Sequence, residues 1–172
     1  MKIAINILLS AIIITLLIIP SEVTDQKKLR IGTYDSRIIA ITCLNSSFYK
    51  NPMQKLYDRM KAAREKGDKK EIESIEWEAG ARQMFRHEQG FGTGSAMEFL
   101  DLIKDELKKL AQKEKLDLIV SKWELAFIGN EVEKVDVTLK LAGIFAPGKN
   151  IEEMAAGMMK QPPVKEAYLI RD

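Results

Sequence analysis

The sequence predicts an α+β protein in which a small antiparallel or mixed sheet forms a body and a helical, coiled-coil hairpin protrudes from it. The predicted elements come as one strand, a long helical stretch, two strands and more helix, which argues against alternating α/β. Within the helical stretch, apolar residues recur at coiled-coil spacing on both sides of a two-residue break, which is typical of an antiparallel hairpin. The chain has 172 residues, 46% of them hydrophobic and 30% charged. It is therefore long enough for one domain and too apolar for wholesale disorder.

The first 20 residues predict export. Lys2 precedes an apolar run over residues 3–19, and Pro20 ends it. A positive start followed by an apolar stretch is typical of a secretory signal. Because no A-x-A cleavage site follows, a cleaved signal peptide and a retained signal anchor both stay open. Residues 21–28 are predicted to be a polar linker.

The helical hairpin is predicted over about residues 52–88, after a strand at 29–34 and a short helix that begins at Asp35 and Ser36. Gly67 and Asp68 form the break between its two helices. A single continuous helix is the alternative, because one glycine costs only about 1 kcal/mol. The residues expected to face one another inside the hairpin are Met53, Leu56, Met60, Ala63, Ile72, Ile75 and Ala79.

The second half of the chain predicts a hinge, two strands and further helix. Residues 90–95 are glycine-rich, but they lack the lysine of a P-loop, and Ser95 replaces the last glycine of a dinucleotide fingerprint, so we expect a flexible hinge. Strands are predicted at 116–121 and 124–128, with Gly129 and Asn130 as a turn and Asp136 beginning a short helix. Residues 146–172 form a C-terminal extension with no predicted role.

Composition excludes several kinds of chemistry. A net charge of +2 argues against a nucleic-acid binder. One cysteine and one histidine exclude a disulfide framework and a Cys/His zinc cluster. We expect Cys43 to be a buried, inert thiol and His87 to be a solvated side chain. Because no nucleophile and base occur together, we expect the protein not to be an enzyme and to have no metal or cofactor.

Three segments resemble the Skp/OmpH family of periplasmic chaperones. Residues 29–37 (LRIGTYDSR) resemble the family's opening strand and helix start, and residues 107–122 (LKKLAQKEKLDLIVSK) resemble its closing helix and strand. Residues 135–138 (VDVT) look like its D-[IV]-T ending. The segments come in the family's order, and the resemblance covers residues 29–145.

The resemblance implies a homotrimer in which each chain contributes strands to a central body and one hairpin as an arm. The arms would hold unfolded outer-membrane or other envelope proteins without ATP. The implied location is periplasmic or otherwise extracytoplasmic, with anchoring in the inner membrane through residues 3–19 as an open alternative. The predicted arms are shorter than is typical of the family, and residues 146–172 lie beyond its ending.

A holdase needs exposed apolar surface and charge that attracts clients, and the hairpin has both. Residues 50–70 hold eight basic and three acidic side chains, a net charge of +5, and four glutamates at 71, 73, 76 and 78 follow. These charges either steer acidic partners or simply pair between the two helices. Met53 and Met60 are expected in the hairpin interior. The predicted client-binding residues are Lys55, Tyr57, Arg59, Lys61, Arg64, Trp77, Met84 and Phe85.

A second function stays open from the sequence. If residues 3–19 remain in the membrane, the chain is a membrane-anchored, oligomeric structural or scaffolding protein of the cell envelope. The state of the mature N-terminus distinguishes the two.

Overall fold

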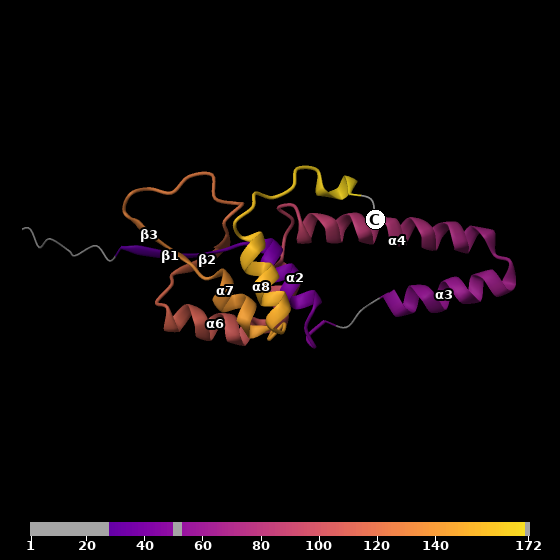
Figure 1. The fold of residues 1–172 in the computed structure, drawn as a ribbon, viewed down its shortest axis with the longest axis horizontal. Helices are drawn as coiled ribbons and strands as arrows, with labels where there is room; N and C mark the ends of the chain where they lie inside the picture. Colours follow the sequence, from indigo (N-terminus) through magenta and orange to yellow (C-terminus); the bar gives the residue numbers. More distant parts are fainter. Residues whose placement is uncertain (1–27, 50–52, 171–172) are drawn as a thin grey trace, which may run out of the picture.

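The computed structural model describes residues 28–49 and 53–170 (Figure 1). The predicted signal over 1–20, the linker residues 21–27 and the start of the hairpin at Asn51 and Pro52 lie outside these residues. The described chain has two parts. A body contains the sheet and most of the helices, and an arm of two long helices, α3 and α4, projects from it (Figure 1).

The sheet of the body is parallel throughout. Its strands are β1 (Leu29–Tyr34), β2 (Leu118–Ser121) and β3 (Val132–Asp136), in the order β2-β1-β3. Gly32 pairs with Ile119 on one side and with Val135 on the other. The prediction of an antiparallel or mixed sheet is therefore wrong.

The connections explain the parallel direction. The helices between β1 and β2 return the chain to the start of the sheet, and residues 122–131 make the same return between β2 and β3. The strand predicted at 124–128 is part of this second connection instead. Gly129 lies at a turn into β3, where the Val132 N–H donates to its carbonyl at 3.2 Å, and no hairpin is closed.

Among the described helices of the body, only the first has a side-chain hydrogen bond at its N-cap. The Asp35 carboxylate accepts the Arg37 N–H at the start of the first helix, as predicted. Asp136 belongs to β3, but its carboxylate still accepts the Thr138 N–H at 2.8 Å. The elements are α2 (Ser36–Leu44), α5 (Met97–Leu100), α6 (Lys104–Lys113), α7 (Thr138–Ile144) and α8 (Lys149–Met158), with short 3-10 helices η1 (Asp101–Ile103) and η2 (Ala167–Leu169).

The main core lies between one face of the sheet and the helices. Gly32 allows a close approach there, because a Cβ at this position would lie 2.7 Å from Leu116 Cδ1. Cys43 is fully buried in this core, and burial raises the pKa of its thiol to about 11. The predicted burial of this thiol is confirmed. Other members of the core are Tyr34, Ile39, Phe99, Ile103, Val137, Leu141 and Phe145.

The arm is a helical hairpin with a small interior of its own. It consists of α3 (Met53–Lys66) and α4 (Lys69–Gly90), which Gly67 separates with a left-handed φ of 67°. The continuous-helix alternative is therefore wrong, and Asp68 caps α4 as predicted. The interior contains Leu56, Ala63 and Ile75, with Met53, Met60 and Ile72 packed against them.

Residues 90–95 form a tight turn at the end of α4. The N–H groups of Gly92 and Gly94 both donate to the Glu88 carbonyl, at 3.1 and 2.9 Å. A Cβ on Gly94 would lie 2.8 Å from the Glu88 carbonyl carbon, so only glycine leaves room for this backbone contact. The prediction of a hinge did not include this packing role.

The C-terminal extension is packed against the body and the root of the arm. Ala155 of α8 is buried with Ile38 and Ala142. The chain then returns to the end of α4, where η2 packs (Figure 1). His87, predicted to be solvated, is only 8% exposed and lies beside the ring of Phe91. That prediction is wrong because the body and the extension cover this end of α4.

Candidate client-binding surface

Three large, exposed apolar side chains of the arm lie on α4. Trp77, Met84 and Phe85 are 76%, 47% and 53% exposed. Because an α-helix has 3.6 residues per turn, Trp77, Ala81 and Met84 share one stripe of α4, with Phe85 at its border. Ile75 faces the opposite way, toward α3. We call Trp77, Ala81, Met84 and Phe85 the outer face of α4.

The predicted residues of α3 lie apart from this face. Tyr57 is 63% exposed. Lys55, Lys61 and Arg64 are exposed as well, and none of the ion pairs in the described part of the chain involves them. The hairpin thus carries unpaired positive charge on one helix and exposed apolar surface on the other.

Arg59 differs from the other basic residues because it joins the two helices. Its guanidinium lies 2.9 Å from a Glu71 carboxylate oxygen and 2.7 Å from one of Glu78. Hydrogen bonds from Arg59 and Arg82 lower the pKa of Glu78. For Arg59, the alternative that the charges pair between the two helices therefore holds. Its side chain forms ion pairs with α4 at the surface of the hairpin.

A cavity of about 810 Å³ opens at the root of the arm, on the side of α4 that faces α3 and the body. Phe85 and Arg86 line it from α4, and Tyr49 and Glu98 line it from the body. Its rim combines aromatic and charged groups, so it can accommodate an apolar segment that also carries polar groups. The sequence analysis predicted only Phe85 among these four residues.

Arg86 is held in place at this root. Its guanidinium pairs with Glu98 at 2.7 Å and lies 5.5 Å from the centre of the Tyr49 ring and 5.3 Å from that of Phe99. Burial favours the neutral acid at Glu98, but hydrogen bonds from Arg86 and Gln89 outweigh it, so the pKa of Glu98 is lowered. The pair fixes the end of α4 to α5. The sequence gives no signal for this ion pair, because only the tight turn at residues 90–95 brings Arg86 and Glu98 together.

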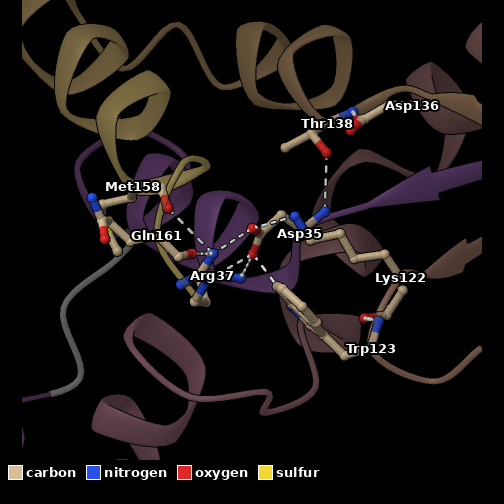
Figure 2. Close-up of polar contacts among 9 residues, drawn as sticks. Asp35, Arg37, Lys122, Trp123, Asp136, Thr138, Met158 and Gln161 are labelled. Atoms are coloured by element: carbon tan, nitrogen blue, oxygen red, sulfur yellow. Dashed lines mark hydrogen bonds and ion pairs between the residues drawn. The ribbon is translucent and has the colours of Figure 1, made fainter. Parts of the chain in front are cut away.

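A second charged cluster lies at the carboxyl end of the sheet (Figure 2). Asp35 follows β1, and Lys122 and Trp123 follow β2. The Asp35 carboxylate pairs with Arg37 at 2.7 Å and with Lys122 at 2.8 Å, and the Trp123 indole N–H donates to it at 3.3 Å. Burial favours the neutral acid, but Arg37 and Lys122 outweigh it and lower the pKa of Asp35.

This cluster also reaches the C-terminal extension. Arg37 donates to the carbonyls of Met158 and Gln161, at 3.3 and 3.0 Å (Figure 2). The side chains of Asp35 and Arg37 are 0% and 2% exposed. Both carboxylate oxygens already accept strong bonds, so we interpret the cluster as a clamp that holds the body together. The sequence signal for this cluster is the presence of polar residues directly after two strands. It indicates a shared site only if the strands are parallel, and the sequence analysis expected an antiparallel or mixed sheet.

Other kinds of site are not found among the described residues. Over residues 28–49 and 53–170, no three His, Cys, Asp or Glu side chains are grouped so that they could hold a metal ion. In the same ranges, no helix combines the length and apolar composition that a membrane crossing requires. Comparison with protein-family models, curated proteins and solved structures finds no match for this chain.

Proposed function

We propose that the protein is an ATP-independent holdase-type chaperone that binds unfolded outer-membrane or other envelope proteins on the outer face of α4. The observation that carries the proposal is the position of Trp77, Met84 and Phe85. They are exposed on an arm that projects from the body (Figure 1), and helix geometry places Trp77 and Met84 on the side of α4 opposite Ile75, which packs in the hairpin interior. The proposal requires no nucleotide and no metal.

The chemistry of this face suits clients of varied sequence. Methionine is flexible and polarisable, and tryptophan supplies a large contact area, so the two can adapt to different apolar segments. Contiguous exposed apolar surface on a folded protein is typical of an interaction site. Exposed Lys55, Lys61 and Arg64 on the neighbouring helix would attract acidic clients and speed their encounter.

We further propose the homotrimer and the extracytoplasmic location that the Skp/OmpH resemblance implies. Parallel sheets are usually covered on both faces, whereas this sheet leaves Leu29 of β1 and Leu118 of β2 46% and 49% exposed. Strands from other copies of the chain would cover them. Light-scattering mass near three chains supports this assembly, and the mass of a monomer contradicts it.

The direct test measures aggregation of an unfolded outer-membrane β-barrel protein in the presence of the purified chain. We expect the wild-type chain to suppress aggregation and the double variant Trp77→Ser/Met84→Ser to lose most of this effect. The free energy of unfolding should change by no more than about 0.5 kcal/mol, because both side chains are on the surface.

Phe127→Ser is the matched control for this test. Phe127 is 86% exposed on the connection between β2 and β3, far along the chain from the arm, and its loss should leave suppression unchanged. If wild type at excess does not reduce aggregation, the chaperone proposal fails. The scaffolding alternative then gains support if mass spectrometry shows that Lys2 is still present in the mature chain.

A further inference from the structure

The C-terminal strap, which we define as residues 162–170, lies against the end of the same face of α4. The Val164 N–H donates to the Phe91 carbonyl at 2.8 Å, and the Tyr168 N–H donates to the Glu88 carboxylate at 3.0 Å. Glu88 continues the stripe of Trp77, Ala81 and Met84, because it follows Met84 by four residues. The strap therefore lies against α4 at the end of this stripe nearest the body, next to Met84, which stays 47% exposed.

The tip of the strap contacts α4 through η2. Ala167 is fully buried where η2 packs on α4, but its neighbours Tyr168 and Leu169 stay 42% and 60% exposed. The chain turns onto α4 at Glu166, whose φ of 55° is unfavourable for a residue other than glycine. At the tip, the buried Ala167 side chain and two N–H donations, from Val164 to the Phe91 carbonyl and from Tyr168 to the Glu88 carboxylate, hold the strap on α4.

The base of the strap is held by a different part of the molecule from its tip. Just before the strap, the carbonyls of Met158 and Gln161 accept hydrogen bonds from buried Arg37. Pro162 and Pro163 then separate this anchored region from Val164. The tip can leave α4 while α8 and the clamp at the sheet stay in place.

The strap approaches α4 as an unfolded client would. It offers backbone N–H groups, one small inward side chain and large apolar neighbours, and an extended segment of another protein can offer the same groups. We propose that the strap is an intramolecular competitor that occupies the body end of the stripe that continues the client-binding face, until a client that extends along the stripe replaces its tip. The client class this predicts is extended apolar segments in which a small residue precedes aromatic or aliphatic ones. This inference rests on the proposed chaperone function.

The test compares two strap variants of the full chain. Ala167→Glu places a charged side chain at a fully buried position and should expel the tip, whereas Lys165→Ala changes an exposed side chain of the same segment. The measured quantity is the affinity for a fluorescently labelled, urea-unfolded outer-membrane β-barrel protein. If the strap is closed in about nine molecules of ten, Ala167→Glu should bind about tenfold more tightly, and Lys165→Ala should match wild type.

The outcomes separate this inference from the proposed function. If wild type and Ala167→Glu bind equally well while Trp77→Ser/Met84→Ser weakens binding, the strap inference is overturned and the chaperone function stands. If wild type and every variant fail to bind the unfolded protein, the proposed function itself fails.

If Ala167→Glu does not fold, hydrogen exchange on the unaltered chain tests whether a client displaces the strap. Addition of the unfolded β-barrel protein should speed exchange of the Val164 and Tyr168 amides and leave the amides of α8 unchanged. Strap amides that stay equally protected while the client is bound would overturn the inference.

Discussion

The body and the arm use their charged and apolar residues in opposite ways. The body buries a complete ion pair, with Asp35 and Arg37 at 0% and 2% exposure and every oxygen of the carboxylate bonded. The arm buries only Leu56, Ala63 and Ile75 in its interior and leaves Trp77 76% exposed. The body is therefore organised to hold one structure, whereas the arm has just enough interior to present a surface. Each prediction below separates these two roles.

The largest effect should follow from breaking the clamp of the body. Asp35→Ala leaves Arg37 buried without its carboxylate, which should lower the free energy of unfolding by about 3–5 kcal/mol. Urea unfolding followed by circular dichroism measures the change. Arg59→Ala is the control, because Arg59 makes its ion pairs at the surface of the arm. Equal unfolding midpoints for the two variants would contradict the role of the clamp.

A smaller and local effect is expected in the arm. Ile75→Ala removes the most buried side chain of the hairpin interior, 2% exposed. We expect a loss of about 2–3 kcal/mol, at the low end for a buried isoleucine because a two-helix interior can relax. Helical circular dichroism should fall at lower temperature than the near-ultraviolet signal of Trp123 in the body. A single shared transition would show that arm and body unfold as one unit.

The smallest expected effect is on how the stability of the body changes as the pH is lowered. The pKa of Asp35 is lowered from its ordinary value of 3.8, so the folded chain holds this carboxylate ionised more strongly than the unfolded chain does. The resulting stabilisation is complete above the unfolded pKa and is lost as pH falls through the folded one. Between pH 5 and pH 2, wild type should therefore lose more stability than Asp35→Asn. Parallel pH profiles of the urea midpoint would exclude this linkage.

Local pattern was enough to predict the arm. The spacing of Leu56, Ala63 and Ile75 and the break at Gly67 depend only on neighbours in the sequence, and the structure has the hairpin close to the predicted bounds. The exposure of Trp77 and Phe85 follows from the same helix geometry once the position of α3 is known.

The parts that were wrong or missed depend on distant residues. Strand direction is set by the return path between β1 and β2, and no local signal distinguished residues 122–131 from a strand and a turn. His87 is buried by segments far from it in the chain. Arg86 meets Glu98 because residues 90–95 form a tight turn, whereas the sequence predicts a flexible hinge there. The contact between the strap and Glu88 joins residues 80 apart, beyond the reach of periodicity.

The position of β1 at the centre of the sheet also governs how the chain must fold. Arg30 of β1 bonds to Asp117, 87 residues later, and to Glu133, 103 residues later. Contacts so distant in sequence form slowly, whereas the α3–α4 hairpin closes between neighbours. During synthesis from the N-terminus, the arm can therefore form while β1 still has no strand to pair with. From the synthesis of β1 until that of β2, this chain carries an unpaired β-strand, which is the kind of segment that we propose it binds in other proteins.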